Sequence, residues 1–285
     1  MIRVIECPRD AMQGLPDFVP TQIKINYINQ LLRVGFDTID FGSFVSAKAI
    51  PQMKDTEQVF DDLDLSQSST KLLAIVANTR GGEVAARLSG INYLGFPLSL
   101  SETFQQRNTN KSITEALNTL NELMNLCVIS GKELVVYLSM GFGNPYGDPY
   151  NPDKVVNFIG ILKSIGVTTI SIADTVGVSR PEQITSLLRK VYSEFDSEIK
   201  FGVHLHSSPH ESKEKLVAAY DSGCRRFDGA LLGFGGCPMA DDKLVGNIDT
   251  QDILDVLSAK GHLNLVDANE FAKAKQMASD LFRSS

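Results

Sequence analysis

The chain has 285 residues, of which 43% are hydrophobic and 21% charged, and its formal net charge is −7. This charge argues against a broad basic face for nucleic acid, and no apolar run approaches the roughly 20 residues that span a bilayer. The length suits either two small domains or one α/β barrel, which typically needs about 250 residues.

The cysteine pattern indicates reduced thiols. Cys7, Cys127, Cys224 and Cys237 are scattered without the Cys-x-x-Cys spacing of a zinc ribbon, and no disulfide framework is suggested. Residues 1–6 enter a strand-like run at once, which leaves no room for a signal or transit peptide. The sequence therefore predicts a cytoplasmic protein.

Short apolar segments with strand character alternate along the chain with segments of helical spacing. The predicted strands are residues 3–5, 36–41, 72–77, 91–96, 134–139, 167–173, 200–203 and 225–230. The predicted helices are residues 21–34, 55–60, 81–88, 112–130, 152–165, 181–195, 211–222, 250–259 and 267–283. Residues 7–14 and 42–53 are expected to be loops. No composition break marks a second domain, so residues 1–285 are predicted to form one.

These eight alternations favour a (β/α)8 TIM barrel with an additional C-terminal helix over an open doubly wound sheet. In such a barrel every loop that follows a strand opens on the same face, at the carboxyl ends of the strands. The polar residues expected to share this rim are Arg9, Asp10, Asp40, Asp174, His204, His206, Cys237 and Asn247.

The histidines of the rim suggest a metal site. Side chains two residues apart on a strand point to the same face, so the imidazoles of His204 and His206 project together. With Asp10 and Asn247 they offer mixed oxygen and nitrogen ligands, which suit a divalent ion such as Mg²⁺ or Mn²⁺. Arg9 adds a fixed cation. The structural alternatives are polar residues at a loop start and a surface ion pair.

Three segments resemble the motifs of one enzyme family. Residues 6–13 resemble Gly-Pro-Arg-Asp-Gly-Leu-Gln, residues 43–53 resemble Ser-Phe-Val-Ser-Pro-Lys-x-x-Pro-Gln-Met, and residues 233–238 resemble Gly-Leu-Gly-Gly-Cys-Pro. The family is 3-hydroxy-3-methylglutaryl-CoA lyase. The resemblance covers nearly the whole chain, with residues 174–178 and 246–247 in the expected order, and the second motif is the most specific.

The resemblance implies a metal-dependent retro-Claisen cleavage of 3-hydroxy-3-methylglutaryl-CoA to acetyl-CoA and acetoacetate. It implies that the metal ligands are Asp10, His204, His206 and Asn247. It implies that the catalytic residues are Arg9, Asp10, Asp40, His204 and Cys237, of which Arg9 faces the thioester oxygen and Cys237 is a thiol on a glycine-rich lid. The candidate substrate contacts are Arg9, Gln13, Ser43, Lys48 and Asp174. An acyl-CoA is thus the expected partner, a homodimer the expected assembly, and leucine breakdown or ketone-body metabolism the expected pathway.

Three positions depart from the family motifs. Asp40 stands where the family has a glutamate, so a proton relay through it has to shift by about 1 Å or use a water. Ser207 and Ser208 replace an Asp-Thr pair, which removes a carboxylate that would orient a ligating imidazole. Ala11 replaces a glycine and implies less space or a different backbone angle.

Several other functions are compatible with these residues. A synthase that joins acetyl-CoA to a 2-oxo acid shares the histidines, but Met12 stands where such synthases carry a glutamate, and their additional C-terminal domain is not expected here. A related acyl-CoA lyase and an aldolase acting on hydroxy-oxo acids are further enzyme alternatives. The non-enzyme alternative is a barrel that binds a ligand without turnover.

Overall fold

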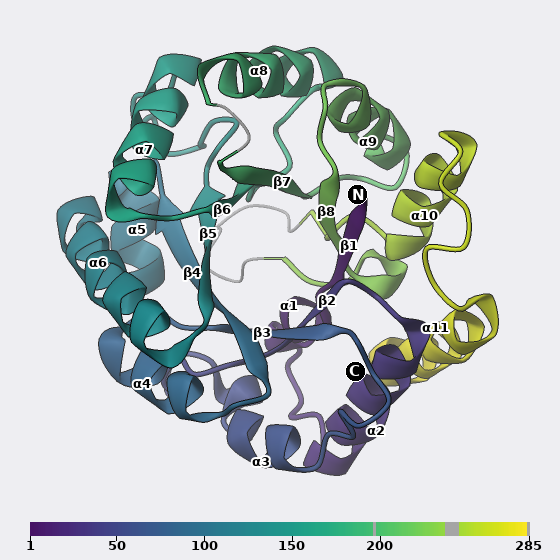
Figure 1. The fold of residues 1–285 in the computed structure, drawn as a ribbon. Helices are drawn as coiled ribbons and strands as arrows, with labels where there is room; N and C mark the ends of the chain where they lie inside the picture. The colour runs from purple at the N-terminus through teal and green to yellow at the C-terminus, as the bar shows by residue number, and fades with distance from the viewer. Residues whose placement is uncertain (196–197, 237–244, 284–285) are drawn as a thin grey trace.

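The computed structural model describes residues 1–195, 198–236 and 245–283 and contains a closed eight-stranded parallel barrel (Figure 1). Neighbouring strands pair in sequence order, and β8 closes the ring against β1. The strands are β1 (Arg3–Glu6), β2 (Thr38–Ser43), β3 (Lys71–Ile75), β4 (Ile91–Ser99), β5 (Glu133–Ser139), β6 (Thr169–Asp174), β7 (Lys200–Leu205) and β8 (Arg226–Gly229). The (β/α)8 fold predicted from the alternation is confirmed.

In Figure 1 most helices lie in a ring around the barrel, and the short helix α1 lies within that ring. The helices are α1 (Pro8–Gln13), α2 (Thr21–Val34), α3 (Thr56–Asp61), α4 (Thr79–Arg87), α5 (Glu102–Thr109), α6 (Ile113–Ser130), α7 (Pro152–Ile165), α8 (Pro181–Glu194), α9 (Ser212–Asp221), α10 (Thr250–Ala259) and α11 (Ala268–Arg283), with 3₁₀ turns η1 (Pro51–Met53) and η2 (Leu231–Gly233). Local sequence signals explain both ends of α6. Ser112 and Glu115 form a capping box at its start, and Gly131 ends it in the left-handed conformation. Among the described residues, no helix combines the length and apolar character needed to cross a membrane.

Two segments that were not predicted to be helical form helices. Residues 8–13 form α1 rather than a loop, because Pro8 occupies the first turn, where its fixed φ favours a helix and its missing N–H is not needed. Residues 102–109 form α5, whose sequence lacks an apolar stripe because Phe104 is its one large apolar residue. Ser101 nevertheless caps this helix by accepting a hydrogen bond from the N–H of Phe104.

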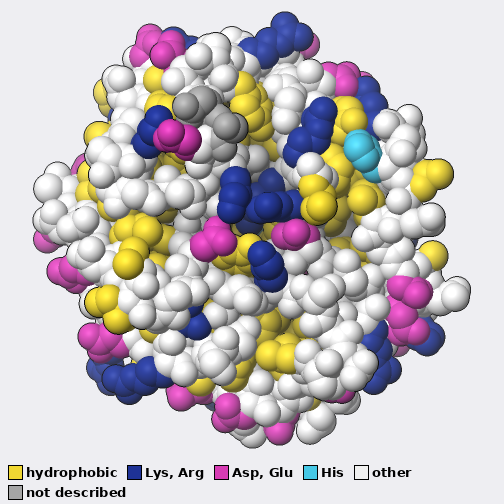
Figure 2. Space-filling view, viewed as in Figure 1, with side chains coloured by type: hydrophobic (Ala, Val, Ile, Leu, Met, Phe, Trp, Pro, Cys, Tyr) yellow, Lys and Arg dark blue, Asp and Glu magenta, His cyan; other side chains and the backbone are white. Residues whose placement is uncertain are grey.

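The barrel lumen is apolar on one side and charged on the other. On the apolar side Leu73, Ile75, Tyr93, Val135 and Tyr137 from β3, β4 and β5 form a separate buried cluster. On the opposite side β7 and β8 bring buried polar side chains into the lumen. Figure 2, viewed as Figure 1, shows charged side chains of both signs gathered over the centre of the barrel.

The C-terminal helix α11 packs against α2 (Figure 1). Phe282 of α11 contacts Tyr27 of α2 edge-on, with ring centroids 6.4 Å apart. The same Phe282 stacks on Phe234, which follows η2, at a centroid distance of 4.6 Å. The additional helix therefore also supports the chain segment that leaves β8.

Cys7, Cys127 and Cys224 are buried free thiols, as the scattered spacing predicts for these three residues.

Candidate active site

A cavity of about 160 Å³ lies at the carboxyl ends of the strands. Its lining includes five polar residues from α1 and the end of β7, namely Arg9, Asp10, Gln13, His204 and His206. Apolar residues of the other wall include Val45, Ile75, Pro97 and Phe104. The cavity therefore joins an ionisable side to an apolar side, an arrangement that suits a small polar substrate carrying a hydrocarbon part.

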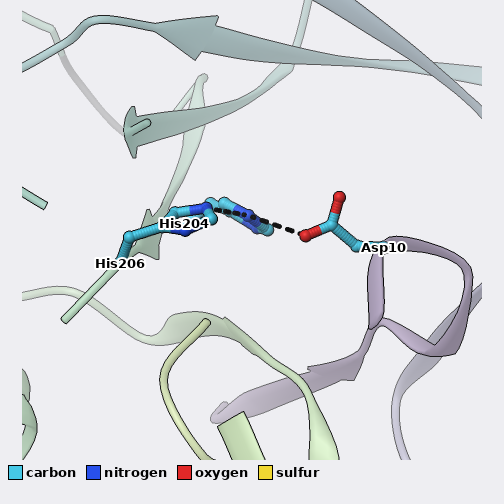
Figure 3. A group of neighbouring side chains, drawn as sticks. All are labelled: Asp10, His204 and His206. Atoms are coloured by element: carbon cyan, nitrogen blue, oxygen red, sulfur yellow. Dashed lines mark hydrogen bonds and ion pairs between the residues drawn. The ribbon is translucent and has the colours of Figure 1, made fainter. Parts of the chain in front are cut away.

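Asp10, His204 and His206 bring three possible ligand atoms within 4.8 Å of one another. The imidazoles project from the end of β7 toward Asp10 on α1 (Figure 3). The two Nε2 atoms lie 3.3 Å apart, and His204 Nε2 lies 3.9 Å from Asp10 Oδ2. The same-face arrangement expected from the two-residue spacing is thus present, and all three side chains are buried.

The outer nitrogen of each imidazole faces an acceptor. His206 Nδ1 lies 2.9 Å from the carbonyl oxygen of Val245, and His204 Nδ1 lies 3.5 Å from Asp228 Oδ2. A proton on each Nδ1 leaves both Nε2 atoms as lone-pair donors that face each other. Two such donors beside a carboxylate make a favourable place for a divalent cation, so the residues present fit a metal ion.

Asn247 joins this group from the last loop. An antiparallel bridge with His206 holds its backbone, and its Nδ2 donates to Asp10 Oδ2 at 2.7 Å and to the carbonyl oxygen of Phe234 at 2.9 Å. Its Oδ1 is buried without a hydrogen-bond partner in the part of the chain that is described. An unpaired buried amide oxygen next to a carboxylate is consistent with a fourth metal ligand.

Arg9 is held by three side chains. Its Nη2 and Nε contact Asp40 Oδ2 at 2.5 and 3.0 Å, and its Nη1 donates to Asp10 Oδ1 at 2.8 Å and to Gln13 Oε1 at 2.9 Å. Gln13 lies one helical turn after Arg9 and donates back to Asp10 at 2.9 Å. The guanidinium is consequently immobilised at the cavity wall.

The two carboxylates beside Arg9 differ in pKa. Burial opposes ionisation of Asp10, but the Arg9 guanidinium and the two imidazoles outweigh it and lower the pKa of Asp10 to about 2. At Asp40 burial dominates and raises the pKa to about 6 in spite of Arg9. Asp10 is therefore the carboxylate that is ready to bind a cation.

Three predicted substrate contacts do not line the cavity. Ser43 is buried and its Oγ accepts a hydrogen bond from the N–H of Val45, while Lys48 is exposed on the loop after β2. Asp174 is buried and accepts hydrogen bonds from the N–H groups of Val178 and Ser179 before α8. Ser43 and Asp174 therefore organise loops, whereas Gln13 does line the cavity.

The motif departures have local explanations. Ala11 lies inside α1, and alanine has the highest helix propensity. This position therefore does not require a backbone angle that favours glycine. Ser207 donates its N–H to the Gly246 carbonyl, and its hydroxyl donates to the carbonyl of Ser208.

Cys237, predicted to be a lid thiol, lies outside the described residues.

Sequence reasoning missed Asp228 and Tyr137, which both contact His204. Asp228 lies beside its Nδ1, and Tyr137 meets its ring edge-on, with centroids 5.7 Å apart. The available signal for Asp228 was the presence of three charged residues, Arg225, Arg226 and Asp228, inside the predicted strand 225–230.

Comparisons with known proteins agree with this geometry. The HMGL-like family model matches residues 4–278. A hydroxymethylglutaryl-CoA lyase of Bacillus subtilis is 34% identical over 250 residues, which cover 88% of this chain and 82% of that protein. An (R)-citramalyl-CoA lyase of Chloroflexus aurantiacus is 28% identical over 95% of this chain and 88% of its own length. The structure of an HMG-CoA lyase from Acinetobacter baumannii, in complex with coenzyme A and 3-methylmalate, has a TM-score of 0.91 and 30% identity, covering 99% of this chain and 91% of that chain.

Proposed function

The chain belongs to the HMGL-like family, and we propose that it is a divalent-metal-dependent carbon–carbon lyase that cleaves 3-hydroxy-3-methylglutaryl-CoA to acetyl-CoA and acetoacetate. The observation that carries the proposal is the convergence of Asp10, His204, His206 and Arg9 on one cavity. Retro-Claisen cleavage requires activation of a substrate hydroxyl and stabilisation of an enolate, and these residues match both needs.

The proposed metal ligands are Asp10, His204, His206 and Asn247. A divalent ion bound there supplies a Lewis acid for oxygen atoms of the substrate. We propose Mg²⁺ or Mn²⁺, because the ligand set combines a carboxylate, an amide oxygen and two imidazoles and leaves positions for a chelating substrate.

Arg9 is proposed to stabilise the leaving enolate. In the reaction the hydroxyl proton is removed, the bond between the α and β carbons breaks, and its electron pair passes into the thioester, giving the acetyl-CoA enolate and acetoacetate. Protonation of the enolate carbon completes acetyl-CoA. Asp40 engages two nitrogens of Arg9, so its proposed role is to hold the guanidinium in place for this charge.

The apolar wall is proposed to receive the hydrocarbon part of the acyl group. Val45, Ile75, Pro97 and Phe104 face the cavity opposite the ionisable residues. Burial of a methyl group there favours binding, because apolar surface leaves water. The cellular setting that we propose is a cytoplasmic homodimer acting in leucine breakdown or ketone-body metabolism, which rests on the family alone.

The test is a cleavage assay with purified protein and Mg²⁺ or Mn²⁺. The substrates are 3-hydroxy-3-methylglutaryl-CoA, citramalyl-CoA and other β-hydroxyacyl-CoA thioesters, and the measurement is acetyl-CoA release. We expect the highest kcat/KM with 3-hydroxy-3-methylglutaryl-CoA. Asp10→Asn should be inactive, whereas Asp153→Asn, on the exposed start of α7, should retain wild-type activity.

Other outcomes separate the alternatives. A preference for citramalyl-CoA would keep the lyase chemistry and change the substrate. Condensation of acetyl-CoA with a 2-oxo acid, without cleavage of any thioester, would replace the lyase by a synthase. Tight binding of an acyl-CoA without turnover under every metal condition would contradict an enzyme and favour a ligand-binding barrel.

A further inference from the structure

A chain of buried polar contacts runs through the barrel lumen to His204. Arg226 Nη1 contacts Asp228 Oδ1 at 2.7 Å, and Asp228 Oδ2 lies 3.5 Å from His204 Nδ1. Ser171 donates its hydroxyl to the same Oδ2 at 3.1 Å. Arg226 is 6% and Asp228 is 3% exposed, so water competes little for these contacts.

The register of β7 and β8 produces this arrangement. His204 pairs with Asp228 across the two strands, and both side chains enter the lumen in one layer. Gly202 and Arg226, each two residues earlier, therefore face the lumen one layer below. A Cβ atom at Gly202 would lie 2.9 Å from Arg226 Cγ and Cδ. The absence of a side chain at Gly202 thus leaves the space that the buried arginine occupies.

The two oxygens of Asp228 serve different partners. Oδ1 faces Arg226 and compensates its buried charge, whereas Oδ2 faces the imidazole and the hydroxyl of Ser171. Because Arg226 and Ser171 hold the carboxylate from two directions, Oδ2 has one defined position relative to the ring. Tyr137 meets His204 edge-on at a centroid distance of 5.7 Å and restricts the ring on another side.

We propose that Asp228, oriented by Arg226, is a positioning residue that places a proton on His204 Nδ1 and directs Nε2 toward the metal site. The proposal rests on the metal site described under the proposed function. A carboxylate that accepts a hydrogen bond from the non-ligating nitrogen of a metal-binding imidazole fixes both the tautomer and the orientation of the ring.

The first test measures Mn²⁺ affinity by electron paramagnetic resonance of the free ion. Asp228→Ala and Asp228→Asn should weaken binding about tenfold to hundredfold, the range found for carboxylates behind ligating histidines. Arg226→Met should weaken it by a smaller factor, because the carboxylate remains but loses its support. The matched control is Glu6→Gln, which removes another buried carboxyl group and should leave the affinity unchanged.

The second test requires no metal. The chain has four histidines, and the ring ¹⁵N resonances can be assigned by single substitutions. At about pH 9, where imidazoles are neutral, His204 in the wild type should show a protonated Nδ1, and Asp228→Asn should shift it toward a mixture of tautomers. A merely structural role of Asp228 would not move this signal, and the isosteric asparagine covers the case in which Asp228→Ala fails to fold.

The outcomes distinguish this inference from the proposed function. Wild-type Mn²⁺ affinity and an unchanged His204 tautomer in a folded Asp228 variant would overturn the positioning role. Loss of affinity together with a changed tautomer would support it, even if the acyl-CoA assay shows no lyase. If the wild type binds no Mn²⁺, the metal site fails, and an unchanged tautomer in Asp228→Asn would then overturn the positioning role as well.

Discussion

At the scale of single residues, the environment of Arg9 decides how it can act. Its donors already face Asp40, Asp10 and Gln13, so the side chain needs no reorganisation when negative charge develops nearby. A fixed donor of this kind contributes mainly in the transition state, because the ground-state thioester carries less charge than the enolate. The guanidinium geometry also matters, since a lysine offers a single charged centre to three partners.

We therefore expect Arg9→Lys and Arg9→Met to lower kcat by about 10² or more, with little change in acyl-CoA affinity. The measurement is steady-state cleavage together with equilibrium binding of a non-cleavable thioester. Arg189→Lys, on the exposed face of α8, is the control and should behave as the wild type. A wild-type kcat in Arg9→Met would remove this residue from the mechanism.

At the scale of elements, the helices α1 and α11 position the segments that carry the site. The short helix α1 places Arg9, Asp10 and Gln13 at helical spacing, so that they contact one another at the mouth of β1. The C-terminal helix α11 supports the segment after β8 through the stacking of Phe282 on Phe234. Asn247 donates to the carbonyl of the same Phe234, which links this support to the candidate ligands.

Phe282→Ala is expected to destabilise the protein by about 3–5 kcal/mol, the usual cost of removing a buried phenylalanine ring. Phe282 is 4% exposed and contacts both Tyr27 and Phe234. Urea unfolding gives the free energy of unfolding directly. Phe18→Ala, at a side chain that is 40% exposed, is the comparison and should cost far less. An equal loss in the two variants would contradict the supporting role of α11.

At the scale of the whole molecule, buried ionisable groups couple the fold to its solution conditions. The candidate ligands come from α1, the end of β7 and the loop before α10, so the native fold is needed to bring them together. Glu6 at the end of β1 accepts hydrogen bonds from the N–H of Leu231 and the hydroxyl of Thr250, and it is completely buried. Metal binding and the ionisation of Glu6 should therefore both change the free energy of unfolding.

A bound divalent ion should stabilise the native state. At a free Mn²⁺ concentration of about 100 times Kd, linkage predicts about 2.7 kcal/mol, which corresponds to a rise of several degrees in Tm. Thermal unfolding with added Mn²⁺ and then with excess chelator measures this difference. Asp10→Asn should lose most of the rise, and a full rise in this variant would place the ion elsewhere.

The buried carboxyl of Glu6 should make stability fall as pH increases. Burial raises the pKa of Glu6 to about 8 from its usual 4.5, so the folded state holds a proton that the unfolded state has released between these values. The contribution of Glu6 is fully present below about pH 4.5 and is lost as pH rises through about 8, with a slope of at most about 1.4 kcal/mol per pH unit. Urea unfolding at several pH values should show a smaller slope for Glu6→Gln, and an identical slope would show that Glu6 is ionised in the native state.

The sequence by itself determined the features that depend on local periodicity. Alternating strand and helix patterns predicted the closed parallel barrel, and the two-residue spacing of His204 and His206 predicted that their imidazoles share a face, as observed. The motifs pointed to the family because they combine residue type with order along the chain. These signals are readable from sequence, since a residue and its near neighbours in the chain generate them.

Only the tertiary structure decided the contacts made across the barrel. The hydrogen bond between Asp10 and Asn247 joins residues 237 positions apart, and the pairing of His204 with Asp228 depends on the register of β7 and β8. No local pattern specifies the register of two strands. The contact between Asp228 and His204 therefore could not be predicted from the sequence. For the same reason Ser43 and Asp174, which were predicted to contact the substrate, do not line the cavity, and their side chains accept hydrogen bonds from loop N–H groups instead.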